Sequence, residues 1–201
     1  MNHNDIYDPS FVQNLFDEMS GTYGIVNLIS SFGFARRWRR QCVRELDLRE
    51  GATVIDLLTG MGELCPDLSR RIGATGRITA LDLSPVMCRK ARRYENQGLP
   101  CAVEVVQANA LHSELPSESF DVAVSSFGLK TFSSQQIEQL AAELHRVLKP
   151  GGTFAFVEIS VPPLTLLRVP YLFYLKHVVP HIGRALMGNP DNYRLLGVYT
   201  Q

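Results

Sequence analysis

The sequence lacks an excess of charge of either sign. Its 201 residues include 20 lysines and arginines and 20 aspartates and glutamates, so the formal net charge is zero. It also lacks an unbroken apolar run of about 18 residues, which a membrane-spanning helix needs. The nearest candidate, residues 161–182, is interrupted by Arg168, Lys176 and His177. These absences argue against a nucleic-acid partner held by bulk charge and against a transmembrane helix.

Cysteine is scarce, and its spacing matches no metal site or disulfide framework. Cys42, Cys65, Cys88 and Cys101 form no CxxC pair, and no pair of His and Cys has zinc-finger spacing. Separate thiols in a chain whose polar N-terminus is no secretory signal fit a reducing compartment. We therefore expect a cytoplasmic protein with buried free thiols and no metal site.

What the sequence does contain is an alternation of short apolar runs and amphipathic stretches. With 45% hydrophobic residues, the chain is long enough for one domain with a full core. Helical spacing is present over 11–19 and over 25–46, with a break near Gly33. Further along, the pattern predicts strands over 53–57, 77–83, 102–107, 120–126 and 153–159, and helices over 64–72, 85–96 and 135–148.

Strands that alternate with helices indicate βαβ units and a parallel sheet. The runs are apolar on both faces, as is typical of strands covered by helices on either side. We therefore expect a three-layer, Rossmann-like α/β fold whose sheet is mostly parallel. Ligands of such sheets bind outside the carboxyl ends of the strands, so functional residues are to be sought there.

The first predicted strand ends in the segment DLLTGMGE (56–63), which suits a nucleoside. Gly60 and Gly62 allow a tight turn and a close approach of backbone to ligand. Asp82 ends the second strand, 20 residues after Gly62, where an acidic residue can accept hydrogen bonds from ribose hydroxyls. A dinucleotide fingerprint would have a third glycine where Cys65 stands, and Asp56 would repel a pyrophosphate. The segment therefore favours a sulfonium nucleoside over a dinucleotide.

At this point the sequence resembles the class I S-adenosylmethionine-dependent methyltransferases, and among them the ubiquinone/menaquinone C-methyltransferase family. Segments 54–64, 78–92, 120–132 and 143–152 carry the likeness to the superfamily. Segments 16–40 (FDEMSGTYGIVNLISSFGFARRWRR) and 173–196 (FYLKHVVPHIGRALMGNPDNYRLL) are more particular to the quinone family. The resemblance implies C-methylation of a lipophilic, quinol-like aromatic molecule, with S-adenosylmethionine as the methyl donor.

The resemblance also implies which residues hold the cofactor. Residues at the first strand end would line its methionine part, and residues after the second would hold ribose and adenine. Asn109 and Ala110 stand where such enzymes usually have an Asp–Ala pair near the adenine amino group. Ser125 or Ser126 would lie near the reacting methyl group, and Phe16 and Tyr23 would form a lid. The implied cofactor residues are Asp56, Leu57, Thr59, Gly60, Gly62, Asp82, Leu83, Met87, Asn109, Ala110, Ser125 and Tyr23.

Several positions depart from the family pattern. Leu58 stands where a small residue is usual, Gly24 replaces an Asp, and Ala35 replaces a His. The usual Arg-Asn after the fourth strand reads Lys130-Thr131. The sixth and seventh strands of the class I sheet are missing from the pattern. An uncovered sheet edge invites pairing, so we expect a homodimer or an unstable monomer.

The catalytic base is less well indicated than the cofactor site. A quinol carbon becomes nucleophilic once its hydroxyl loses a proton, which calls for a base or a polarising group. The candidates are His177, Tyr193 and Lys130, with His177 more typical of a helix surface or a satisfied core histidine. Asp17 and Glu158 are more typical of cap or network residues.

The chain thus divides into a helical lid (1–50), a cofactor-binding core (51–160) and an apolar helical segment that covers the substrate (161–201). The apolar segment suits an isoprenoid tail or an interfacial helix with peripheral membrane contact, and plain core packing or a dimer face explains it equally well. The arginines around residues 36–44 and 89–93 are interpreted as solvated helix faces. Two alternative functions stay open: a natural-product O- or C-methyltransferase, and a non-catalytic methyltransferase-like scaffold.

Overall fold

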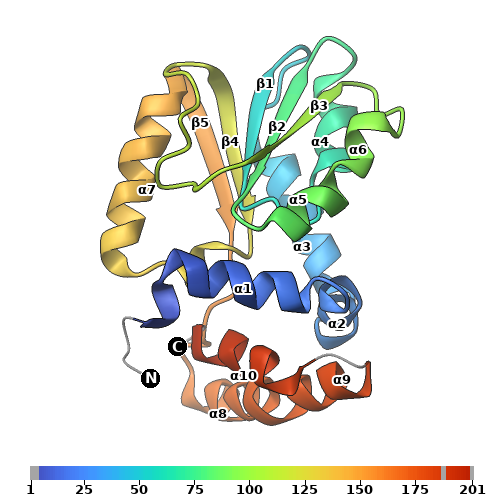
Figure 1. Ribbon diagram of the computed structural model, residues 1–201, viewed down its shortest axis with the longest axis vertical. Helices are drawn as coiled ribbons and strands as arrows, with labels where there is room; N and C mark the ends of the chain where they lie inside the picture. The colour runs from blue at the N-terminus through green and yellow to red at the C-terminus, as the bar shows by residue number, and fades with distance from the viewer. Residues whose placement is uncertain (1–4, 187–188, 200–201) are drawn as a thin grey trace.

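The computed structural model describes residues 5–186 and 189–199, and its centre is one parallel sheet (Figure 1). Within these residues the sheet has five strands in the order β3-β2-β1-β4-β5, all paired in parallel. The strands are β1 (Thr53–Leu57), β2 (Arg77–Asp82), β3 (Ala102–Gln107), β4 (Phe120–Ser126) and β5 (Leu148–Val157). The predicted α/β class and the five strands are confirmed, and no further strand follows β5 in the described part of the chain.

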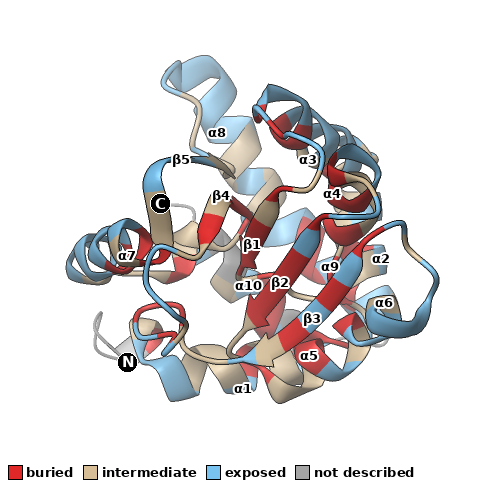
Figure 2. Cartoon of the chain, turned by 90° about the horizontal axis from the view of Figure 1, so that it is seen from above, coloured by how far each residue is buried: buried red, intermediate tan, exposed pale blue. Residues whose placement is uncertain are grey.

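Helices cover both faces of the sheet and give the predicted three layers (Figure 2). On one face, α3 (Phe34–Glu45), α4 (Cys65–Ile72) and α5 (Pro85–Ala91) contribute Val43, Leu68 and Cys88 to a core under β1 and β2. On the other face, α7 (Ser134–Val147) packs Leu140 and Leu144 against β1 and β4. Cys42, Cys65, Cys88 and Cys101 are buried free thiols, as expected.

A layer of helices closes the carboxyl-terminal end of the sheet. Figure 1 shows α1 (Pro9–Met19) running across the strand ends, with the C-terminal helices beneath it. The layer also includes α2 (Tyr23–Ser30), α8 (Thr165–Phe173), a π-helical turn (Tyr174–Val178), α9 (Val179–Ala185) and α10 (Pro190–Tyr199). Its core contains Met19, Val26, Val179 and the fully buried Tyr193. N-terminal and C-terminal segments are therefore packed as one unit over the carboxyl ends of the strands.

Local sequence signals set the helix ends. Gly33 has φ +77° and separates α2 from α3, which confirms the predicted break. Ser84 caps α5 by accepting a hydrogen bond from Met87 N at 3.0 Å. Ser133 caps α7 in a reciprocal capping box with Gln136. Each side-chain oxygen satisfies a backbone N–H that lacks a partner in the first turn of its helix.

The element bounds differ from the sequence prediction, most clearly at one helix and two strands. The helix predicted over 85–96 is interrupted at Arg92, so that α5 is followed by a short α6 (Arg93–Asn96). This break accompanies the packing of Tyr94 against Gly62, where an added Cβ would lie 2.8 Å from the tyrosine ring. The second strand ends at Asp82, and the fifth begins at Leu148, before a register shift in its pairing with β4.

The described residues contain neither of two other kinds of feature. None of their helices has the length and apolar character to cross a membrane. Nor does this part of the chain gather three or more His, Cys, Asp or Glu side chains as a metal site would.

Candidate active site

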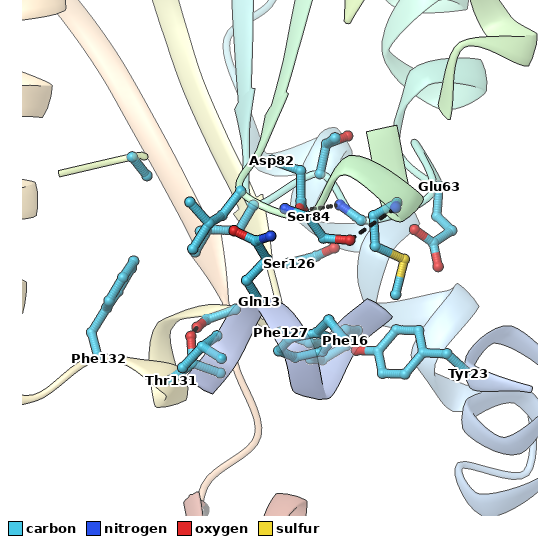
Figure 3. Close-up of a pocket in the computed structure, with 18 of the residues that line it drawn as sticks. Gln13, Phe16, Tyr23, Glu63, Asp82, Ser84, Ser126, Phe127, Thr131 and Phe132 are labelled. Atoms are coloured by element: carbon cyan, nitrogen blue, oxygen red, sulfur yellow. Dashed lines mark hydrogen bonds between the residues drawn. The ribbon is translucent and has the colours of Figure 1, made fainter. Parts of the chain in front are cut away.

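Two adjoining clefts lie between the strand ends and the helical layer. The first, called here the cofactor cleft, has an empty volume of about 710 Å³ including the solvent at its mouth. Figure 3 shows Asp82 and Glu63 on its sheet side and Phe16 and Tyr23 on the helical side. The cleft is lined by Val12, Gln13, Phe16, Tyr23, Arg39, Leu58, Thr59, Gly60, Glu63, Asp82, Leu83, Ser84, Met87, Asn109, Ala110, Ser126, Phe127, Gly128, Thr131 and Phe132.

The turn after β1 shapes the floor of the cofactor cleft. Leu58, Gly60 and Gly62 all have positive φ, at +56°, +59° and +77°. Glycine adopts this backbone without cost, but Leu58 does so against the clash of its Cβ with the backbone. Its side chain lies against Gly128, where an added Cβ would be 2.5 Å from Leu58 Cδ1. The missing side chain at Gly128 therefore makes room for the unusual leucine.

Asp82 is held at the end of β2 by the backbone around it. Its Oδ2 accepts a hydrogen bond from Gly60 N at 2.7 Å, and its Oδ1 accepts one from Ser84 N at 2.9 Å. Burial raises the pKa of this carboxyl to about 6, although both backbone hydrogen bonds lower it. Each carboxylate oxygen keeps a lone pair, so the group can accept from a ligand diol in the cleft.

Asp56 lies deeper, beneath the same turn. It is 1% exposed, and its Oδ2 accepts a hydrogen bond from the Thr59 hydroxyl at 2.5 Å. Its Oδ1 is buried without a hydrogen-bond partner among the described residues, as is the hydroxyl of Ser125 at the end of β4. Burial raises the pKa of the Asp56 carboxyl to about 7. An orphaned buried acceptor of this kind is suited to a cationic or N–H donor supplied by a ligand.

Sequence reasoning missed an ion pair inside the cofactor cleft. Arg39 Nη2 lies 3.5 Å from Glu63 Oε1, and both residues line the cleft. Arg39 also donates from Nε to the Ser126 hydroxyl at 3.2 Å. Helical periodicity was the signal that could have shown Arg39 to face inward, since Arg39 shares a face of α3 with the buried residues Ala35 and Cys42. Arg39 is therefore an inward-facing residue within a helix whose other arginines are exposed.

The remaining lining residues suit an aromatic base. Leu83 and Ala110 face the cleft, and Met87 is 1% exposed at its edge. The Asn109 side-chain oxygen accepts a hydrogen bond from Leu111 N at 3.0 Å. This bond leaves the amide oxygen one lone pair and leaves the NH₂ group its two N–H donors, so Asn109 can accept from a ligand or donate to it. Leu57 and Gly62, in contrast, do not line the cleft, because Leu57 is buried in the core and Gly62 packs against Tyr94.

The second cleft, called here the acceptor cleft, is more apolar. It has an empty volume of about 810 Å³ including open solvent. Tyr23 and Phe127 line both clefts, so these two side chains form a shared wall. The acceptor cleft is lined by Tyr23, Asn27, Ser30, Ser31, Ala35, Trp38, Phe127, Lys130, Ile159, Tyr171, Tyr174, Leu175, Val179 and Tyr193.

Lys130 is the one lysine or arginine that lines this acceptor cleft in the described residues. Its Nζ lies 3.0 Å from Glu158 Oε1 and donates to the carbonyl oxygen of Phe127. Only 6% of the side chain is exposed, and burial lowers the pKa of the ammonium group. Glu158 also accepts from Lys130 N at 3.1 Å. The ion pair therefore places a desolvated positive charge at the wall of an apolar cleft.

The other two catalytic candidates lie in different surroundings. Tyr193 lines the acceptor cleft, but its hydroxyl is bonded to the Thr22 hydroxyl at 2.7 Å and burial raises its pKa. His177 is exposed and packs on Phe173, with ring centroids 4.8 Å apart. The structure therefore does not bring His177 to either cleft, because its helical turn points it toward solvent.

A five-stranded parallel sheet with a glycine turn after β1, an acidic residue after β2 and a helical cover defines an S-adenosylmethionine-dependent methyltransferase of the class I fold. Among solved structures, an S-adenosylmethionine-dependent methyltransferase from Aquifex aeolicus is 28% identical, with a TM-score of 0.57 over 73% of this chain and 77% of that one. A phosphoethanolamine N-methyltransferase from Haemonchus contortus shares the fold at 16% identity, with a TM-score of 0.63 over 81% of this chain and 34% of that one.

Residues 2–199 match the model of the ubiE/COQ5 methyltransferase family, and the chain belongs to that family. The ubiquinone/menaquinone biosynthesis C-methyltransferase UbiE of Enterobacter sp. is 36% identical over 92% of this chain and 73% of its own length. The protein of the same name from Hydrogenovibrio crunogenus is 33% identical over 92% of this chain and 72% of its own length. The resemblance seen in the sequence is confirmed, and the comparisons favour an enzyme over a non-catalytic scaffold.

Proposed function

We propose that this methyltransferase binds S-adenosylmethionine in the cofactor cleft and methylates a ring carbon of a lipophilic quinol in the acceptor cleft. The observation that carries the proposal is the meeting of the two clefts at Tyr23 and Phe127. One side of this wall has half-buried carboxylates, and the other is apolar with one buried cation. The names of the relatives support a quinone precursor as the acceptor.

The cofactor cleft fits the cofactor group by group. Asp82 would accept from the ribose hydroxyls, with Leu83, Met87 and Ala110 around the adenine and Asn109 donating to a ring nitrogen. Arg39 and Glu63 carry opposite charges 3.5 Å apart, which complements the carboxylate and ammonium of an amino acid. The unpartnered Asp56 Oδ1 adds a second acceptor beneath the turn.

When bound, the cofactor would supply a methyl group that is activated by the positive sulfur next to it. The chain's own contribution is to orient the acceptor and to stabilise its anionic form. A phenol has a pKa near 10, and a desolvated ammonium beside the oxygen favours the phenolate. We assign this role to Lys130, whose buried ammonium group supports the proposal, while Tyr193 would hold two helices together through its bond to Thr22. Tyr23, whose pKa is raised to about 12 by burial, stays protonated and can donate a hydrogen bond.

Calorimetry with S-adenosylmethionine and S-adenosylhomocysteine tests the cofactor half of the proposal. Asp82→Asn should weaken binding by about 1.5 kcal/mol, roughly tenfold, because an anionic acceptor of two hydrogen bonds is lost. Asp121→Asn is the matched control, since Asp121 bonds Thr53 and Lys149 beside β1 and β5 and lines neither cleft. Equal losses in both variants would show that the ribose is not bound at Asp82.

Product analysis tests the acceptor half. A short-chain benzoquinol and a naphthoquinol, kept reduced, should each be offered with the methyl donor, and the new methyl group located on carbon or oxygen. Methylation on a ring carbon supports the proposal. Methylation on oxygen, or turnover only with non-quinol phenols, would contradict it.

A further inference from the structure

Two segments that line the acceptor cleft also carry exposed apolar side chains. On one side, Phe32 is 79% exposed, Phe34 47% and Trp38 37%. On the other side, α8 contributes Tyr171 to the cleft but has no buried residue. We call the set Phe32, Phe34, Trp38, Leu166, Leu167 and Val169 the apolar rim, all of them exposed.

Each half of the apolar rim adjoins residues that line the acceptor cleft, Trp38 on one side and Tyr171 and Tyr174 on the other. The ring of Phe32 stacks on Tyr174, which directly follows α8, with centroids 6.2 Å apart. Phe34 stacks on Trp38 at 5.7 Å, and Trp38 meets Phe127 at 6.3 Å. Aromatic contacts therefore lead from the rim to the wall between the two clefts. Exposed apolar side chains that adjoin a ligand cleft are typical of an interaction surface for a partner protein, a ligand or a membrane.

The charge around the rim is one-sided, although the whole chain is neutral. Residues 19–44 contain five arginines, residues 159–190 contain Arg168, Lys176 and Arg184, and neither segment contains an Asp or Glu. Arg36 and Arg37 are exposed beside Trp38 and form no ion pair within the described residues. Exposed apolar and aromatic side chains on segments whose charges are all positive are the composition that binds the interface of an anionic bilayer.

We propose that the apolar rim docks the protein on an anionic phospholipid membrane, with the acceptor cleft opening toward the lipid. A lipophilic acceptor could then pass from the bilayer into the cleft without crossing water. The rim inserts at the headgroup level, since none of the described helices is suited to span the bilayer. The route of the acceptor rests on the proposed function, whereas the membrane contact itself can be measured without substrate.

Vesicle flotation provides the first test. Vesicles made of equal parts phosphatidylcholine and phosphatidylglycerol should bind the protein at least tenfold better than phosphatidylcholine alone. Phe32→Ser combined with Leu166→Ser should lower this binding at least tenfold. The matched control is Ile137→Ser, which alters an exposed apolar residue of α7 outside the rim and should leave binding unchanged.

The single tryptophan of the chain offers an independent readout. Because Trp38 belongs to the rim and is the only Trp, its fluorescence should shift to the blue when the mixed vesicles are added. Arg36→Gln combined with Arg37→Gln should weaken binding to these vesicles and reduce its dependence on salt. A water-soluble quinol assayed without vesicles should be methylated equally by wild type and by the Phe32→Ser/Leu166→Ser variant. This arm separates failure of membrane docking from failure of the proposed function.

Three outcomes would overturn the docking proposal. The first is the absence of both vesicle binding and the Trp38 shift. The second is equal binding with and without phosphatidylglycerol, or an equal loss in the control variant. The third is self-association in solution that the Phe32→Ser/Leu166→Ser variant abolishes, which would assign the rim to a second copy of the chain.

Discussion

At the scale of single residues, Asp82 of the cofactor cleft and Asp56 beneath the turn at its floor have the most unusual environments. Burial raises the pKa of Asp56 to about 7 and that of Asp82 to about 6, from an ordinary value of 3.8. Between pH 3.8 and about 6 to 7, the folded protein therefore keeps protons on Asp56 and Asp82 that the unfolded chain has already released. This contribution to stability is present below pH 3.8 and is lost as the pH rises through about 6 to 7.

Cofactor affinity should change in the opposite direction over the same window. Ionised carboxylates accept hydrogen bonds from hydroxyl and ammonium groups better than protonated ones do, so affinity should rise as the pH passes through about 6 to 7. Calorimetric titrations at several pH values, with Asp56→Asn as the comparison, measure the effect. The rise should be shallower in that variant, and a flat profile in the wild type would contradict the assignment.

Lys130 provides the second residue-scale prediction. Lys130→Met should lower turnover about 100-fold, the scale of a lost charge-stabilising group, while the affinity for the methyl donor stays the same. The variant leaves Glu158 half-buried without its cation, which costs stability. The double variant Lys130→Met/Glu158→Gln removes that orphan charge, so it should regain stability without regaining turnover. If the double variant regains activity, Lys130 acts only through the fold.

The sequence predicted these residues unevenly, for physical reasons. Asp82 was predictable because the distance from a glycine turn to the next strand end is set locally by one βαβ unit. The ion pair between Arg39 and Glu63 was not, since it joins α3 to the turn after β1 across the folded chain. His177 was misleading, because an apolar neighbourhood in sequence does not decide which side of a helix faces solvent.

At the scale of elements, the cap of α5 links the sheet to the helical layer. The Ser84 hydroxyl accepts from Met87 N at 3.0 Å and donates to Asp17 of α1. Ser84→Ala should therefore lower stability by about 1 kcal/mol, which is about 2–4 °C in melting temperature for a chain of this size. It should also weaken cofactor binding, because α1 lines the cleft through Phe16.

A matched cap serves as the control. Ser133 caps α7 with the same chemistry, by accepting from Gln136 N at 3.3 Å, and it lines neither cleft. Ser133→Ala should lower the melting temperature by a similar amount and leave cofactor affinity unchanged. The same loss of affinity in both variants would show that Ser84 acts through global stability alone.

At the scale of the whole molecule, the sheet has an open edge. β5 pairs with β4 on one side and with no other strand in the described residues, and Phe154 on it is 61% exposed. We expect this edge to pair with a second copy or to leave the monomer unstable. Light scattering should show a dimer that Phe154→Lys dissociates. A monomeric protein with an ordinary melting temperature would rule out both the pairing of this edge with a second copy and the instability of the monomer.

The contact between Leu58 and Gly128 has a consequence for how this family varies. An added Cβ at Gly128 would lie 2.5 Å from Leu58 Cδ1, so the two positions, 70 residues apart, cannot change independently. Gly128→Ala should be tolerated only together with a smaller residue at position 58. Among natural relatives the two sites should therefore coevolve, with a bulky residue at one found only beside glycine at the other.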